Sequence, residues 1–173
     1  MFILEKHGMM LKTNNSFIKE GSMEICKLTS NFIDQTLQIY KNCLNQTNLS
    51  ESTLKITNSY PYNHIYIAKI ESQIYGVIDY SILSNEAYLN NIAVLPEYRN
   101  KKIASSLMEH MINVCREQNV KSISLEVRCS NQVAISFYKK FNFIKIAKRS
   151  NLYCQPTEDG WVMELTIKQQ PIQ

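Results

Sequence analysis

The chain has 173 residues, 45% of them hydrophobic, which is enough for one domain with a packed core and too few for two comfortable ones. Its formal net charge of +4 is mildly basic, so it suits an anionic ligand without indicating nucleic acid. No stretch approaches the roughly 18 consecutive apolar residues of a membrane span. The five cysteines are scattered without a CxxC pair, which favours reduced thiols in a cytosolic setting over a disulfide frame or a zinc site.

The two ends of the chain differ from its middle. Residues 1–22 show no sustained periodicity and end in Glu-Gly-Ser, so we expect an N-terminal tail there. A start codon upstream of a working domain that begins at Met23 explains them equally well. We expect the domain over residues 23–168 and a short C-terminal tail over residues 169–173.

In its first half the domain is expected to contain, in order, one strand, two helices and three strands. Ser30 or Asn31 can cap the first helix. Glu71-Ser72-Gln73 separates two runs rich in Ile, Tyr and Val, which predicts a hairpin. The expected strands cover residues 23–28, 64–70, 74–82 and 87–95, and the expected helices cover residues 32–44 and 50–57.

The second half alternates helices and strands. Pro96 ends the strand over residues 87–95, and apolar residues then recur at three and four positions, which predicts a helix from about residue 100. A mixed α/β (α+β) domain with helices on both faces of its sheet follows from this order. The remaining elements are strands over residues 122–127, 143–147 and 161–167 and a helix over residues 131–141.

A basic loop lies between the strand that Pro96 ends and the helix that follows. The first backbone N–H groups of a helix lack internal partners, and their dipoles favour an anion. Arg99, Lys101 and Lys102 add positive charge at this point, which suits a pyrophosphate. A solvated basic turn is the alternative that this stretch leaves open.

This loop resembles a known one. Residues 99–104, Arg-Asn-Lys-Lys-Ile-Ala, are similar to the Gln/Arg-x-x-Gly-x-Gly/Ala loop with which the GNAT acyltransferase superfamily holds the pyrophosphate of acetyl-CoA, although Lys102 stands where glycine is usual. The resemblance implies the GNAT fold, a mixed and mostly antiparallel sheet of about six to seven strands, with acetyl-CoA as the acetyl donor. It implies cofactor contacts at Ile92, Ala93, Val94, Arg99, Asn100, Lys101, Lys102, Ile103, Ala104, Ser105 and Asn131.

A second stretch narrows the resemblance. Residues 125–143 carry Leu-Glu-Val-Arg-x-Ser-Asn, then Ala-Ile, Tyr and a closing Asn-Phe, and resemble the bacterial ribosomal-protein-alanine N-acetyltransferases, without a gap from residue 91 to 143. In that subfamily the position of Glu126 is the general base and that of Tyr138 the general acid. A strand carboxylate can take the proton of an α-ammonium whose pKa is about 8, and a tyrosine can protonate the leaving thiolate.

The last part of the resemblance concerns the acceptor. Tyr153 and Glu158 match a hairpin that helps to form the peptide groove in the relatives, although Leu152 and Trp161 depart from the pattern. The implied enzyme is a cytoplasmic monomer that acetylates the N-terminal α-amine of a protein, such as a small-subunit ribosomal protein. A small-molecule amine or lysine acetyltransferase remains an alternative, as does a weakly catalytic acyl-CoA sensor motivated by Lys102. The three histidines are far apart and no aromatic-basic stripe is present, so we expect no metal site and no direct nucleic-acid contact.

Overall fold

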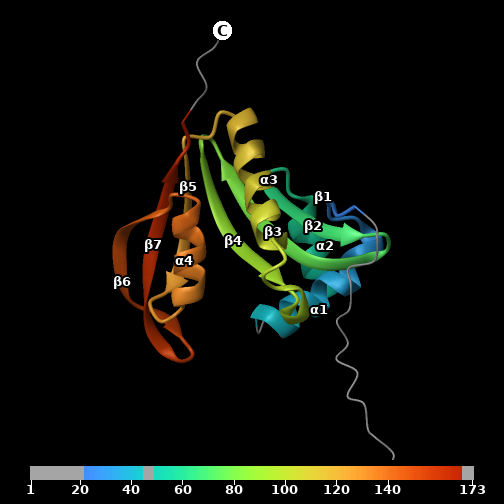
Figure 1. Ribbon diagram of the computed structural model, residues 1–173, viewed down its shortest axis with the longest axis horizontal. Coiled ribbons are helices and arrows are strands. Elements are labelled where there is room, and N and C mark those ends of the chain that lie inside the picture. The colour runs from blue at the N-terminus through green and yellow to red at the C-terminus, as the bar shows by residue number, and fades with distance from the viewer. Residues whose placement is uncertain (1–21, 45–48, 169–173) are drawn as a thin grey trace, which may run out of the picture.

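A single seven-stranded sheet organises the protein (Figure 1). The computed structural model describes residues 22–44 and 49–168. Within them the strand order is β1-β2-β3-β4-β5-β7-β6; β4 and β5 run parallel and the other neighbours antiparallel. This confirms the mixed, mostly antiparallel sheet. The strands are β1 (Glu24–Lys27), β2 (Asn63–Ile70), β3 (Gln73–Leu83), β4 (Glu86–Val94), β5 (Ser122–Arg128), β6 (Ile144–Cys154) and β7 (Thr157–Thr166).

Four helices cover the two faces of the sheet (Figure 1). α1 (Ile33–Leu44) and α2 (Glu51–Ser59) pack on one face, where Ile39, Tyr40 and Leu54 join a core with β2 and β3. α3 (Ile103–Glu117) and α4 (Gln132–Lys140) pack on the other, around a larger core. The face under α1 and α2 therefore has no helix over β5, β7 and β6 among the elements described.

The apolar spacing of α3 explains how it lies on the sheet. It buries Ile103, Leu107, Met108, Met111, Ile112 and Cys115, a stripe with the three-and-four spacing of an amphipathic helix. Its first turn lies very close to β3 at Gly76, where an added Cβ would be 3.0 Å from Ile103 Cγ2 and 3.2 Å from Leu107 Cδ1. Glycine at this position sets the start of α3, and with it the basic loop, against the sheet.

Several predicted boundaries were wrong. Ser30 and Asn31 lie in a short 3-10 turn, η1 (Ser30–Phe32), and α1 begins only at Ile33. Ser50 caps α2, since its side chain accepts from Thr53 N–H, and α2 runs two residues past the predicted end. α3 begins at Ile103, after a 3-10 turn, η2 (Pro96–Tyr98), and not near residue 100.

The largest error concerns the final hairpin. Strands predicted over residues 143–147 and 161–167 extend to β6 (Ile144–Cys154) and β7 (Thr157–Thr166), with their turn at Gln155 and Pro156. β6 is an edge strand whose residues are mostly exposed, so it carries little apolar alternation for sequence patterns to detect. The expected N-terminal tail, apart from Ser22, and the expected C-terminal tail lie outside the described residues.

Candidate active site

The basic loop enters α3 through two left-handed residues. Asn100 has a φ of 62° and Lys102 a φ of 64°, the backbone region that favours glycine. Lys102 thus adopts the conformation of the glycine it replaces, and its side chain is exposed. The first intrahelical bond runs from Ser106 N–H to Lys102 O at 2.9 Å, so the amides of residues 103–105 lie at the helix mouth. This backbone fits a pyrophosphate.

The cationic side chains of the loop lie beside that mouth. Lys101 Nζ is 4.9 Å from the ring centroid of Tyr98, which fixes its position by a cation–π contact. Arg99 Nε donates to the carbonyl of Val94 at 3.4 Å, which joins the loop to the end of β4. The loop is therefore joined to the end of β4 and presents positive charge there.

The two parallel strands part in the middle of the sheet. β4 and β5 are paired from Glu86 with Ser122 to Leu89 with Leu125, and no further. Immediately after Leu89 a bulge interrupts the β3–β4 ladder, because Tyr80 pairs with Leu89 and Asp79 with Asn91. β4 continues to Val94 and β5 to Arg128, so residues 90–94 diverge from β5. Residues 92–94 therefore border an opening between the two strands, where β5 no longer pairs with β4.

Tyr138 lies on α4 and belongs to the core on the face of the sheet that α3 and α4 cover. It is 8% exposed, and its ring packs against Phe137 and Phe143, with centroids 5.6 and 5.8 Å away. Burial, with a smaller contribution from Tyr153, raises the pKa of Tyr138 to about 12. The hydroxyl therefore keeps its proton at neutral pH and can donate it.

Glu126 lies on the opposite face of β5. Its neighbours Leu125 and Val127 belong to the core under α3 and α4, so the alternation of a strand turns Glu126 toward the face without a helix. Its Oε1 is 2.6 Å from Arg149 Nη1 on β6, in a pair whose side chains are 42% and 60% exposed. Sequence reasoning missed Arg149, because β7 separates β5 from β6 and no spacing motif links the two residues.

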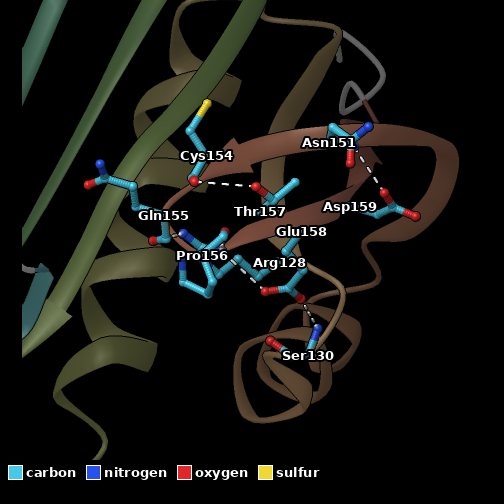
Figure 2. A network of polar contacts seen from close by, with 9 residues as sticks. All are labelled: Arg128, Ser130, Asn151, Cys154, Gln155, Pro156, Thr157, Glu158 and Asp159. Atoms are coloured by element: carbon cyan, nitrogen blue, oxygen red, sulfur yellow. Dashed lines mark hydrogen bonds and ion pairs between the residues drawn. The ribbon is translucent and has the colours of Figure 1, made fainter.

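Arg128, the last residue of β5, contacts the turn between β6 and β7 (Figure 2). It donates to the carbonyls of Gln155 at 2.9 Å and Pro156 at 3.0 Å, and its Nη1 lies 3.2 Å from Glu158 Oε2. The other carboxylate oxygen of Glu158 accepts the Ser130 N–H at 2.6 Å, and this bond and Arg128 lower the pKa of Glu158. Glu158, predicted as an acceptor contact, thus already joins the hairpin to the β5–α4 loop.

Tyr153 links the two proposed catalytic residues. The Arg128 guanidinium carbon lies 4.2 Å from its ring centroid. Burial raises the pKa of Tyr153, and the nearby charge of Glu126 raises it further. Tyr153 also raises the pKa of Tyr138, so its ring is within electrostatic range of both Tyr138 and Glu126.

The remaining candidates have other surroundings. Asn131 caps α4, accepting the Ala134 N–H at 3.1 Å. His64 stacks on Tyr80 at a centroid distance of 5.0 Å, and His110 packs at a tilt against Tyr66 at 4.3 Å, while His7 lies outside the described residues. All five cysteines, which fall within the described residues, are free thiols. Within residues 22–44 and 49–168, no group of three or more His, Cys, Asp or Glu side chains could hold a metal, and no helix is long and apolar enough to cross a membrane.

Comparisons with known proteins agree with this geometry. Residues 33–143 match the acetyltransferase (GNAT) family model. A Bacillus subtilis protein with the provisional name ribosomal protein bS18-alanine N-acetyltransferase is 33% identical over 109 residues, 63% of this chain and 72% of that protein. The Escherichia coli ribosomal protein bS18-alanine N-acetyltransferase is 39% identical over 79 residues, 46% of this chain and 52% of its own length.

The similarity extends to a solved structure. The crystal structure of the E. coli ribosomal-protein-S18-alanine N-acetyltransferase superposes with a TM-score of 0.76 and 25% identity, covering 86% of this chain and 96% of that one. The overall fold is thus that of a known architecture. The chain belongs to the acetyltransferase (GNAT) family, as an N-acetyltransferase with acetyl-CoA as its acetyl donor.

Proposed function

We propose that this enzyme acetylates the N-terminal α-amine of a protein, of the ribosomal-protein-alanine type. The observation that carries the proposal is the end of the β4–β5 pairing at Leu89 and Leu125, because Glu126 is the next residue of β5 and burial keeps the Tyr138 hydroxyl protonated. The bacterial relatives named for alanine acetylation of ribosomal protein bS18 support the choice of acceptor.

The donor is held by the loop and the splayed strand. The amides of residues 103–105 and the charges of Arg99 and Lys101 bind the pyrophosphate, and the left-handed backbone of Lys102 leads into α3 at this point. The backbone of residues 92–94 aligns the arm that carries the thioester, and Asn131 contacts that arm while capping α4. An N–H of this strand, aimed at the thioester carbonyl, stabilises the negative charge that develops on its oxygen.

Acetyl-CoA supplies a thioester carbon for attack by the acceptor amine. Glu126 takes one proton from the α-ammonium, directly or through a water, so that the nitrogen lone pair becomes available. The N–C bond forms and the C–S bond breaks. Tyr138 then donates its proton to the departing thiolate, which is restored as the thiol of coenzyme A, and the second proton that the nitrogen loses as it becomes an amide returns to the Tyr138 oxygen. The acceptor ammonium competes with Arg149 for the Glu126 carboxylate, so the ion pair on β5 and β6 is the resting state of the base.

The acceptor approaches from the face that carries Glu126. Tyr153 contacts the first residues of the peptide, and Glu158 holds the hairpin that presents Tyr153. We propose further that the enzyme works as a monomer in the cytoplasm, where its five thiols stay reduced.

A peptide panel tests the function. Purified protein is incubated with acetyl-CoA and peptides that differ in their first residue, including the Ala-first start of a small-subunit ribosomal protein, and the products are sequenced by mass spectrometry. We expect a single acetyl group on the α-amine of the Ala-first peptide. Acetylation confined to lysine side chains or to small amines would contradict the proposed acceptor and support a lysine or small-molecule amine acetyltransferase. Binding of coenzyme A without any transfer would leave the acyl-CoA sensor as the function.

A further inference from the structure

A buried carboxylate lies beside the bulge of β4. Asp79 on β3 is 9% exposed, and its Oδ2 accepts two hydrogen bonds, from Tyr40 Oη at 2.5 Å and from Asn91 Nδ2 at 2.8 Å. Tyr40 belongs to α1 and is 2% exposed, and Asn91 is the β4 residue that pairs with Asp79 just after the bulge. The cluster of Tyr40, Asp79 and Asn91 therefore joins α1, β3 and the splayed part of β4.

Asp79 also has apolar neighbours in the core. Ile65, its cross-strand partner on β2, and Val77, two residues earlier on the same face, are 1% and 0% exposed. Burial raises the pKa of Asp79, while the hydrogen bonds from Tyr40 and Asn91 act in the opposite direction. Burying a polar group here costs stability, and a well-packed apolar residue would avoid that cost. A role other than stability is therefore needed to explain the cluster.

Side chains of β3 contact the bulge of β4. Asn90, the extra residue, donates from its side chain to Ser81 Oγ at 3.1 Å, and its side chain also bonds Asp79. α1 meets the far end of the same segment, where Cys43 Sγ lies 3.7 Å from Val94 O. Residues 90–94, the part of β4 that has left β5, are thus fixed at both ends by side chains of α1 and β3.

We propose that the cluster of Tyr40, Asp79 and Asn91 is a positioning device that fixes the splayed end of β4, so that its backbone aligns the thioester with the acceptor amine. This inference rests on the proposed function and deepens it. The pyrophosphate is held elsewhere, at the start of α3, so the device governs alignment in the reaction more than affinity for the donor. It also couples α1, on the acceptor face, to the donor strand.

The test uses Tyr40→Phe, which removes one hydroxyl and keeps the buried ring. We expect kcat to fall by about tenfold to a hundredfold, because small misplacements of reacting groups have costs of this size, while the KM for acetyl-CoA changes by less than about threefold. The control is Thr36→Val, which removes a buried hydroxyl of the same helix that donates only to Phe32 O, at 2.8 Å, and should leave kcat unchanged.

Two substitutions at Asp79 should lower kcat to different extents. Asp79→Asn keeps an acceptor oxygen for Tyr40 and Asn91 and should retain more of kcat than Asp79→Leu, which keeps none. The double variant Tyr40→Phe/Asp79→Asn should lose less than the product of the two single losses, because both changes act on one device. If Asp79→Leu does not fold, Tyr40→Phe and its control still decide the question.

Two results would overturn the inference. One is a Tyr40→Phe enzyme with the kcat of the wild type, and the other is a loss of kcat that Thr36→Val reproduces at equal thermal stability. Absence of acetyl transfer by the wild type would instead contradict the proposed function, so the two failures are distinguishable.

Discussion

The substitution Tyr138→Phe isolates the proposed acid. The Tyr138 ring packs against Phe137 and Phe143, and phenylalanine keeps both contacts while removing only the hydroxyl. Because the Tyr138 pKa is about 12, the hydroxyl is about four pH units from ionising at pH 8 and is available as a proton donor throughout the neutral range.

The expected effect follows from the role of the hydroxyl. A positioned general acid contributes about 10²–10⁴-fold to a rate, which corresponds to about 3–5 kcal/mol of activation free energy. Loss of one hydroxyl with retention of the ring changes the free energy of unfolding by only about 1 kcal/mol. We therefore expect kcat to fall at least about a hundredfold, with coenzyme A affinity and thermal stability close to those of the wild type.

The assay measures acetylated peptide by mass spectrometry across pH 6 to 10, with coenzyme A affinity from calorimetry. Its control is Tyr80→Phe, the same chemical change at a tyrosine of β3 whose buried hydroxyl has no hydrogen-bond partner within the described residues. That variant should keep full activity and lose no stability. We expect the activity of the wild type not to fall at alkaline pH up to pH 10, because Tyr138 would lose its proton only near pH 12. Equal turnover by Tyr138→Phe and wild type would refute the acid role.

Three further predictions concern the base, the loop and the hairpin. Glu126→Gln should lower kcat/KM most below the acceptor amine pKa of about 8, and a loss that is the same at every pH from 6 to 10 would point to a structural role. Lys102→Gly should tighten acetyl-CoA binding and raise stability by about 1 kcal/mol, since the left-handed backbone strains an L-residue and not glycine; weaker binding by calorimetry would show that the ammonium is itself a contact. Because the folded-state pKa of Glu158 is lowered, its contribution to stability is complete above the unfolded value of about 4.3 and is lost as the pH falls through the folded value. Glu158→Gln should therefore destabilise the protein at pH 7 and have little effect near pH 2, and equal losses of melting temperature at both would contradict this.

Strong local patterns made the sheet and its helices predictable. The hairpin over β2 and β3 and the amphipathic stripe of α3 each follow from residues near one another in sequence, and each is present in the structure. The family fold was identified from residues 91–143, which contain the loop and the Glu126 and Tyr138 positions.

Contacts between distant strands account for what the sequence did not predict. Arg149 reaches Glu126 across β7, and Arg128 reaches the carbonyls of Gln155 and Pro156 at the far turn. The bulge at Asn90 depends on Asp79, whose partner Tyr40 is 39 residues away. Pairing register and side-chain direction decide such contacts, and neither can be read from the spacing of residues along one element.

The central claim is that donor and acceptor meet between β4 and β5, with Tyr138 on one side and Glu126 on the other. A crystal structure of the enzyme with coenzyme A tests this most directly. The account predicts the pyrophosphate on the amides of residues 103–105 and the sulfur within hydrogen-bond reach of Tyr138 Oη. A sulfur atom outside the opening, or a Tyr138 hydroxyl turned away from it, would contradict the account.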